Sequence, residues 1–470
     1  MTEKLKIVIP CDTFAPDING AARFAERLAG GLVRHGHEVH IIAPSFDDSA
    51  GDRIENHDGV DMVVHRLRSH RVPQHKTLRW PEPWGMTRRI EKILSEVQPD
   101  AVHIQSHLMV GRFALRAVRK QGLRVLATNH IMPENLLRYS LLPKFLHGLA
   151  MKMIWADAGR ILRKMDALTT PTKRAAELLE AAAGVSGVLA ISCGIDASRF
   201  ANNTPTQNRE PVALFLGRLD DEKRIDVFLR AVASLADFPN LRVELVGDGG
   251  ERERLQQLAQ QLGIASRVAF LGHVTDEELP GTYERSTVFV MPSIAELQSI
   301  ATMEAMASGR PVIAANAMAL PHLVHNGDNG YLFEPNNVAD LAAKLRRVLQ
   351  ADEVELARLS ENSLHLIQAH DIERTIKIFE DLYQGIGETA PTTRDNEPDY
   401  FRPIGQLPDS VRKRLDEFRK DAVELRARAE RLREEARAKL DEVRAEVREQ
   451  LTEIRSEVSE AAKRLRKKRD

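Results

Sequence analysis

Two glutamates separated by eight positions are the first residues whose type and spacing could do chemistry. Glu296 stands in a polar stretch, and Glu304 lies inside a helical pattern that Ser308-Gly309-Arg310-Pro311 ends. If all eight steps were helical, the two Cα atoms would lie about 12 Å apart. Two carboxylates that act on one sugar carbon need a separation of only about 5–9 Å. The spacing instead suits two carboxylates that accept hydrogen bonds from different hydroxyls of one long ligand. A solvated pair of glutamates on a surface helix gives the same pattern.

Short apolar runs that alternate with helical patterns must position these carboxylates. In the first half, the expected strands cover residues 4–10, 38–43, 62–67, 101–105, 124–128, 167–170 and 188–192. In the second half, they cover residues 212–216, 242–246, 268–271, 288–291, 312–315 and 331–333. Apolar runs without alternation are typical of parallel strands buried on both faces, and the helices between them complete βαβ units. The pattern predicts an α/β protein with two doubly wound domains that face a cleft.

The chain divides into four segments by composition. The expected domains are residues 1–195 and residues 196–384, and the last helix of the second, at 372–383, can cross back to the first. Residues 385–408 are rich in Pro, Thr and Asp and are expected to be a flexible linker. Residues 409–470 lack Gly and Pro and hold 20 Lys and Arg against 16 Asp and Glu, which predicts a long charged helix. This helix could form a coiled coil with a second copy, stay solvated, or lie on anionic lipid.

Composition excludes several classes of function. A formal net charge of −1 over 470 residues predicts no general attraction to nucleic acid. Cys11 and Cys193 are the two cysteines, so the chain has neither a disulfide framework nor a cysteine cluster for metal, which suits the cytoplasm. The N-terminus runs directly into the first expected strand without a signal peptide, and no apolar run approaches the roughly 20 residues of a spanning helix.

Four motifs follow one another in the second half of the chain. They are Gly217-Arg218-Leu219 with Glu222-Lys223, then Gly247-Asp248-Gly249, then Phe270-Leu271-Gly272, and finally Glu296 with Glu304 before Ala305-Met306-Ala307-Ser308-Gly309. In this order and spacing they resemble the retaining glycosyltransferases of family 4, over roughly residues 4–382. The resemblance implies the GT-B fold of two Rossmann-like domains, here with a long helical extension at the C-terminus, and a hexosyltransferase that uses a nucleotide-sugar.

The resemblance also implies a donor site. Its donor-binding residues are Gly20, Arg218, Lys223, Gly247, Asp248, Gly249, Ser299, Ile300 and Glu304. Arg218 and Lys223 would contact the diphosphate, where a planar guanidinium and a compact ammonium both suit phosphate oxygens. Glu304 would accept from the ribose hydroxyls, and Glu296 would contact the transferred sugar. With two cations at the diphosphate, no cofactor and no metal are implied.

Two loops depart from the family pattern. Leu297-Gln298-Ser299 stands where Gly-Phe-Gly is common, so Ser299 makes the backbone less permissive. Ala21 stands where a second glycine commonly follows Gly20. Backbone N–H groups at the start of the following helix can still bind phosphate, which keeps activity compatible with these changes.

Histidines at the ends of expected strands are the candidates nearest the reacting carbon. His107 and His130 both follow strands of the first domain, and we count them as catalytic together with Glu296. The family often has histidine where Gln105 stands, whereas His103 is expected to be a core residue. Glu134 and Asn135 follow His130 and are the acceptor-binding candidates. A front-side displacement with retention of configuration fits a site that supplies mainly electrostatic stabilisation.

The acceptor is inferred from apolar and basic segments. Residues 136–164 are apolar and basic, and residues 66–79 hold several basic residues next to Trp80 and Trp84. Such segments favour adsorption to an anionic membrane surface, although a core helix and an ordinary surface loop would look the same. Together with His130 and Glu134, segment 136–164 looks similar to that of the monotopic family members that glycosylate diacylglycerol or related lipids. We therefore expect transfer from a UDP- or GDP-sugar to a membrane lipid or glycolipid by a peripheral protein on the cytoplasmic face. The alternatives are a soluble acceptor, such as an inositol derivative or a glycan, and a membrane-associated scaffold whose site has decayed.

Overall fold

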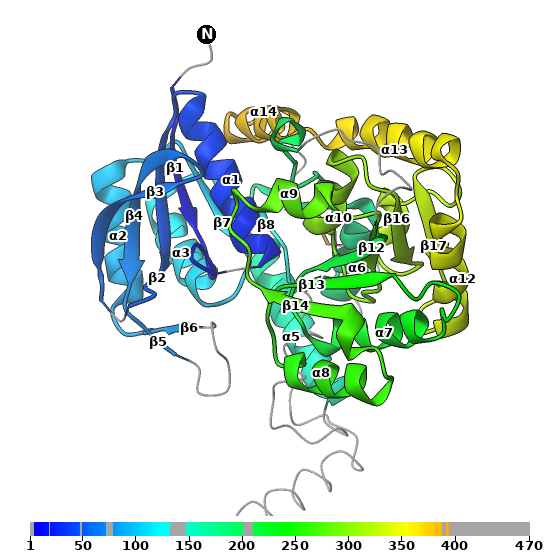
Figure 1. Ribbon diagram of the computed structural model, residues 1–470. Coiled ribbons are helices and arrows are strands. Elements are labelled where there is room, and N and C mark those ends of the chain that lie inside the picture. Colours follow the sequence, from blue (N-terminus) through cyan, green and yellow to red (C-terminus); the bar gives the residue numbers. More distant parts are fainter. Residues whose placement is uncertain are drawn as a thin grey trace, which may run out of the picture. The chain divides into compact units, whose positions relative to one another are not determined.

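The computed structural model describes residues 4–17, 19–47, 49–71, 79–131, 147–200, 210–387 and 392–393 (Figure 1). They all belong to one compact unit, Met1–Pro398. The predicted acceptor residues Glu134 and Asn135, most of the predicted linker and the predicted helix over 409–470 lie outside the described residues.

The first sheet holds the strands of the N-terminal half in the order β11-β9-β8-β7-β1-β2-β4-β3. These strands are β1 (Lys6–Pro10), β2 (Glu38–Pro44), β3 (Gly51–His57), β4 (Val60–Leu67), β7 (Ala101–Gln105), β8 (Val125–Thr128), β9 (Ala167–Thr170) and β11 (Leu189–Ala190). All neighbours pair in parallel except β3, which runs antiparallel to β4 at the edge. The sequence did not predict β3. Its polar residues alternate because only one face of this edge strand is covered.

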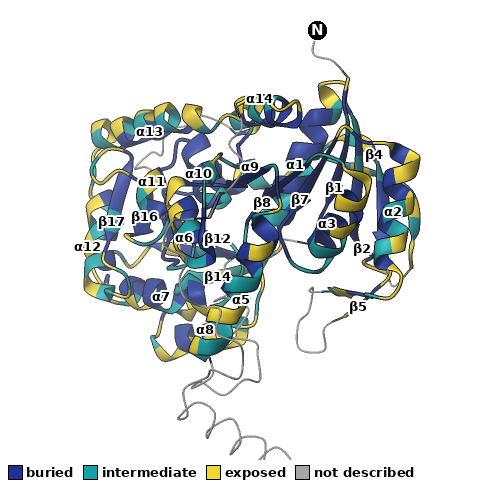
Figure 2. Cartoon of the chain, turned by 180° about the vertical axis from the view of Figure 1, so that it is seen from behind, coloured by how far each residue is buried: buried dark blue, intermediate teal, exposed yellow. Residues whose placement is uncertain are grey.

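Helices cover both faces of this sheet, as the apolar runs predicted. Ile7 and Ile9 of β1 belong to the core that packs on α1 (Gly20–Arg34), whereas Val8 belongs to the core on the opposite face. The opposite face is covered by α2 (Met86–Val97), α3 (Met109–Gln121), α5 (His147–Leu162) and α6 (Lys173–Ala183). Figure 2 shows buried strands inside and exposed residues on the outer sides of the helices.

The second sheet is wholly parallel, in the order β14-β13-β12-β15-β16-β17. Its strands are β12 (Val212–Leu216), β13 (Arg242–Val246), β14 (Val268–Gly272), β15 (Val288–Met291), β16 (Val312–Ala315) and β17 (Gly330–Phe333). Its helices are α7 (Ile225–Ala233), α8 (Arg252–Gln261), α9 (Leu279–Glu284), α10 (Ile300–Ala307), α11 (Leu320–Leu323), α12 (Val338–Leu349) and α13 (Glu353–Ile367). Four short strands stand apart: β5 (Ser69–Arg71) pairs with β6 (Arg79–Pro81), and β10 (Val185–Ser186) with β18 (Thr392–Thr393).

Each sheet reverses its strand order once, and the reversals decide where ligands can bind. In the first sheet the reversal lies between β1 and β7, and in the second between β12 and β15. Loops that leave the carboxyl ends of the two strands diverge at such a point and open a crevice. The candidate residues Gly20, His107, Arg218 and Glu296 all lie on the loops or helix starts that follow these four strands.

The last described helix, α14 (Ile372–Tyr383), packs on α1 of the first domain (Figure 1). Glu380 of α14 is buried and accepts hydrogen bonds from His35 Nδ1 at 2.6 Å and His37 Nε2 at 3.0 Å. Gly31 of α1 allows the close approach, because a Cβ there would lie 2.1 Å from Ile376 Cδ1. Helix α14 therefore joins the C-terminal half of the chain to the N-terminal domain.

This contact predicts a stability that depends on pH. Burial lowers the pKa of His35, but hydrogen bonds to Glu380 and Glu373 outweigh it, so the pKa lies above its usual 6.5. Burial raises the pKa of Glu380, but the hydrogen bonds from His35 and His37 outweigh it, so that pKa lies below its usual 4.5. The ionised pair stabilises the fold between about pH 4.5 and 6.5, and the contribution is lost above the raised pKa of His35 and below the lowered pKa of Glu380.

We expect Glu380→Gln to lower the thermal midpoint more at pH 6 than at pH 9, where His35 is neutral in both proteins. A lost hydrogen bond to a charged group costs about 1.5–3 kcal/mol, and partial exposure of His35 reduces this figure. Thermal denaturation of both proteins at the two pH values measures the difference. Glu361→Gln, an exposed change on α13, is the control. An equal fall in the thermal midpoint at pH 6 and at pH 9 would contradict a stabilising ion pair between His35 and Glu380.

Candidate active site

The N-terminus of α1 faces the N-terminus of α10. A Cβ built on Gly20 would lie 4.0 Å from Ile300 Cδ1, so the first residues of the two helices are neighbours. Asn19 caps α1 by accepting from Ala22 N, and Ser299 caps α10 by accepting from Thr302 N. Each cap leaves further N–H groups of the first turn free, and both helix dipoles place positive potential in the same region. This geometry suits an anion such as a diphosphate.

Glu304 is buried at the junction of the two domains. Its Oε1 accepts from Arg27 of α1 at 2.7 Å, and its Oε2 accepts from the hydroxyl of Tyr283 at 3.0 Å. Burial lowers the pKa of Arg27, but the ionised Glu304 beside it outweighs burial and raises that pKa above its usual value. Each carboxylate oxygen has a second lone pair, so Glu304 can still accept from the hydroxyls of a ligand.

Lys223 and Glu296 form an ion pair between the loops that follow β12 and β15. Both side chains are largely buried, at 14% and 11% exposure. The sequence assigned one residue to phosphate and the other to a sugar, and the structure brings the two together. Arg218, from the same loop as Lys223, is more exposed and donates to Asp220 and to Glu222 Oε1.

Gly247 and Gly249 support the loop that carries Arg218. A Cβ on Gly247 would lie 2.0 Å from the carbonyl oxygen of Gly217, and a Cβ on Gly249 would lie 2.4 Å from that of Leu219. Gly247 also has a φ of +125°, which few other residues adopt. Between them, the carbonyl of Asp248 accepts from Leu219 N, and its exposed carboxylate lies 3.9 Å from Arg252. The motif therefore has a packing role, and direct donor contact stays a prediction.

The unusual stretch Leu297–Ser299 is held against the first domain. Thr172 donates to the carbonyl of Leu297 at 2.9 Å. The amide of Gln298 accepts from Cys193 N at 2.7 Å and donates to the hydroxyl of Ser192 at 3.0 Å. Ser299 has a φ of −94°, so this position does not need glycine. Gln298 thus binds the end of the first domain, a role that the sequence did not reveal.

His130 lies at the end of a chain of buried hydrogen bonds. Its Nε2 donates to Gln105 Oε1 at 3.0 Å, and the Gln105 amide contacts His103 Nε2 at 3.2 Å. His103 in turn bonds to Tyr383 of α14 at 2.8 Å, so it is the core residue that the sequence predicted. Burial lowers the pKa of His130 to about 4. At neutral pH its Nδ1 therefore carries no proton and can accept a hydrogen bond.

His107 is buried on the neighbouring loop. Burial, aided by the charge of Arg112, lowers its pKa to about 4, so it too is neutral at pH 7. Its Nδ1 has no hydrogen-bond partner among the described residues. No hydrogen bond joins His107 to His130 within the described ranges, because His107 interacts with Asn129 and His130 with Gln105.

Asp12, which the sequence analysis did not single out, holds the loop of His107. Its carboxylate accepts from the hydroxyl of Ser106 at 2.8 Å and from Val110 N at 2.6 Å. Ser106 has a φ of +78°, a conformation that needs such support. Burial raises the pKa of Asp12 to about 6 against the effect of these hydrogen bonds. Asp12 therefore positions His107.

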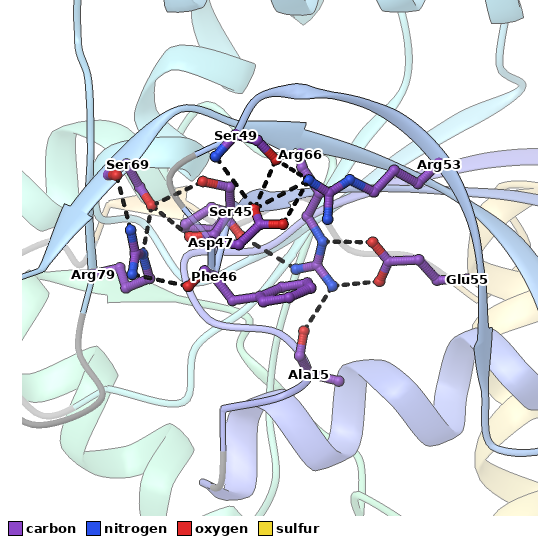
Figure 3. A network of polar contacts seen from close by, with 11 residues as sticks. Ala15, Ser45, Phe46, Asp47, Ser49, Arg53, Glu55, Arg66, Ser69 and Arg79 are labelled. Carbon is purple, nitrogen blue, oxygen red and sulfur yellow. Dashed lines mark hydrogen bonds and ion pairs between the residues drawn. The ribbon is translucent and has the colours of Figure 1, made fainter.

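Arg66 does not belong to the basic surface that the sequence predicted. Its guanidinium is buried, pairs with Glu55 of β3 and donates to the carbonyls of Ala15 and Pro44 (Figure 3). The prediction failed because β3, which supplies Glu55, was not recognised. Arg66 instead holds the loop after β1 that leads to Gly20.

Other parts of the predicted membrane surface are exposed. Trp80 is 54% exposed and Trp84 is 85% exposed. In contrast, α5 buries Trp155 and Leu162, so the described part of segment 136–164 contributes to the core. No helix in the described ranges combines the length and the apolar character that crossing a membrane requires.

Together these residues provide positive potential for a diphosphate, two carboxylates for hydroxyls and two neutral imidazoles. A leaving group that gains negative charge would be stabilised between the helix N-termini and the cations Arg218 and Lys223. The carboxylates Glu296 and Glu304 lie on either side of the start of α10 and can orient a long polyhydroxylated ligand.

Comparisons with known proteins identify the family and the fold. The family model described as Glycosyltransferase Family 4 matches residues 18–199, and the model described as Glycosyl transferases group 1 matches residues 196–365. A GDP-mannose-dependent alpha-mannosyltransferase of Mycolicibacterium smegmatis is 30% identical over 73% of this chain and 90% of its own length. The alpha-monoglucosyldiacylglycerol synthase of Acholeplasma laidlawii is 25% identical over 81% of this chain and 96% of its own.

A solved structure shows the same fold. Sucrose-phosphate synthase from Thermosynechococcus elongatus superposes with a TM-score of 0.67, over 81% of this chain and 99% of that one, at 21% identity. Fold, motif order and relatives agree, and the chain belongs to the family 4 glycosyltransferases with the GT-B fold.

Proposed function

We propose that the protein transfers a hexose, with retention of configuration and without a metal ion, from a UDP- or GDP-sugar to a membrane lipid or glycolipid. The observation that carries the proposal is the meeting of the α1 and α10 N-termini near two buried carboxylates, Glu296 paired with Lys223 and Glu304 paired with Arg27. One nucleotide-sugar can occupy all of these groups at once, because its ribose, diphosphate and hexose follow one another.

The donor binds as an extended chain along α10. Glu304 accepts hydrogen bonds from the ribose hydroxyls, and Glu296 accepts them from the hexose hydroxyls. Between these two carboxylates, the backbone N–H groups of Gly20, Ser299 and Ile300 lie near the diphosphate. Lys223 already pairs with Glu296, so an ammonium next to the proposed sugar contact is available to the adjoining phosphate. Arg218 can turn from Asp220 and Glu222 to phosphate, because its side chain is 40% exposed.

Catalysis rests on stabilising the leaving diphosphate. Lys223, Arg218 and the two helix dipoles supply positive charge where negative charge grows, which is the role that a metal ion has in other enzymes. The acceptor hydroxyl attacks from the side of the leaving group, and a phosphate oxygen takes its proton. The neutral imidazoles of His107 and His130 orient the acceptor.

A lipid acceptor is supported by two observations. One relative is named for diacylglycerol glucosylation. In addition, Trp80 and Trp84 are exposed beside the basic residues Arg68 and Arg71, a combination that favours the interface of an anionic membrane. The protein would then act at the cytoplasmic face as a peripheral protein. The same site could use a soluble acceptor, such as an inositol derivative or a glycan, since the donor side would not change.

Product analysis tests the reaction itself. Purified protein, vesicles of diacylglycerol and anionic phospholipid, and a panel of UDP- and GDP-sugars are combined, and products are identified by mass spectrometry and NMR. We expect one α-hexosyl lipid from an α-linked donor, and an undiminished rate in excess EDTA. A β-linked product would contradict retention, and a loss of rate that Mg²⁺ or Mn²⁺ restores would contradict metal independence. If no donor is turned over or hydrolysed, the scaffold alternative holds.

Substitution of Glu296 tests the role of the carboxylate. Glu296→Gln keeps the shape but removes the charge that pairs with Lys223 and accepts from the sugar. We expect kcat/KM for the donor to fall about 10- to 100-fold, because a hydrogen bond to a charged group contributes about 1.5–3 kcal/mol. Steady-state rates with donor varied measure the effect, and Glu361→Gln on the surface of α13 is the matched control. An unchanged kcat/KM would remove Glu296 from the site.

A further inference from the structure

A cavity is lined by the starts of α6 and α14 and by the end of α11. Its volume is about 500 Å³, which is the size of a site for a small metabolite. From α10 it is lined by Met306, and none of the donor-binding candidates contributes to its wall. We propose that this cavity is a binding site for a phosphate group, either free or carried on a small metabolite.

Basic side chains line the wall. Lys173, Arg374, His322, His325 and His370 all contribute to it, and no aspartate or glutamate does. Burial lowers the pKa of His370 to about 4, so its imidazole is neutral at pH 7 and the positive charge comes from Lys173 and Arg374. Lys173 and Arg374 are exposed, and neither side chain forms an ion pair or hydrogen bond within the described part of the chain. Cations gathered without counter-charges repel one another, and a bound anion would remove this cost.

The nearby carboxylates already have other partners. Asp371 accepts from the backbone N–H groups of Glu373 and Arg374 as the cap of α14. Glu373 pairs with His35 of α1, on the side that contacts the first domain. Neither carboxylate is part of the cavity wall, so neither occupies the space that an anion would take.

One helix start adds positive potential at the cavity wall. Lys173 is the first residue of α6, whose dipole is positive there, whereas the capping carboxylate of α14 offsets the dipole of that helix. The hydroxyls of Thr172 and Thr375 line the cavity but already donate to backbone carbonyls. The ammonium of Lys173 and the guanidinium of Arg374 match the oxygens of a phosphate dianion.

A ligand bound in this cavity would contact both domains. Lys173 and Ser192 belong to the first domain, His322 and His325 to the second, and Arg374 to the helix that joins the second domain to the first. Ser192 also holds Gln298 of the donor loop, so the cavity and the donor site share a hydrogen-bonded segment. A ligand that contacts all of these elements favours one arrangement of the domains over others.

Phosphate binding can be measured with the whole protein. Thermal denaturation is followed as inorganic phosphate is titrated at constant ionic strength with chloride, and glucose 6-phosphate is tested in parallel as a phosphate monoester. The double variant Lys173→Gln/Arg374→Gln removes two exposed cations from the cavity wall. Lys92→Gln/Arg119→Gln makes the same charge change at exposed positions on α2 and α3. Lys223→Gln removes the cation of the donor site.

We expect a saturable rise of the midpoint with phosphate in the wild type, the Lys92/Arg119 control and Lys223→Gln. The cavity variant should need at least ten-fold more phosphate for the same rise. Retention of the wild-type response in the cavity variant, its loss in Lys223→Gln, or an unsaturable response equal to that of chloride would each overturn the proposal. A response to glucose 6-phosphate but not to free phosphate identifies the phosphate-bearing metabolite as the source.

Discussion

The buried ion pair between Arg27 and Glu304 is the contact on which the site depends. Arg27 comes from α1 of the first domain and Glu304 from α10 of the second, at 2.7 Å and with 13% and 5% exposure. Breaking a buried pair by removing one partner costs about 3–5 kcal/mol, because it leaves an uncompensated charge. The pair therefore keeps the two helices in register and holds their N-termini opposite each other. Arg23 and Asp276 reinforce the same junction nearer the surface.

The topology of the two sheets explains why these helices can meet. Parallel strands send all their following loops to one edge, and each sheet opens a crevice where its strand order reverses. The first crevice contributes Gly20 and His107, and the second contributes Lys223 and Glu296. Thr172 and Gln298 then bind the donor loop to the first domain. The site is thus built from groups on both domains, and a change in domain arrangement would alter it.

The sequence predicted the regular elements well because their signals are local. The strands at 101–105, 212–216 and 242–246 and the helix at 372–383 have the predicted bounds. Strand β3 was missed, although Asp58-Gly59, both with positive φ, is a strong hairpin signal. That omission also made Arg66 look like a surface cation rather than the partner of Glu55.

The partnerships within the site could not be predicted in the same way. Nothing in the spacing of the chain shows that Lys223 and Glu296 form a pair, that Gln298 binds the end of the first domain, or that Arg27 meets Glu304 from 277 residues away. These contacts arise from tertiary packing, and they turn a set of residue types into a site. The family resemblance carries the tertiary arrangement of known members, and its assignment of these residues to the donor stays a prediction.

The central claim is that Glu304 recognises the ribose of the donor, and calorimetry can test it. Binding of UDP and GDP is compared with binding of their 2′,3′-dideoxy analogues, in the wild type and in Glu304→Gln. We predict that the wild type binds the ribonucleotide of its donor at least about ten-fold more tightly than the dideoxy form, and that the variant loses most of this preference. Equal affinity for both forms in the wild type, or an unchanged preference in Glu304→Gln, would contradict the account.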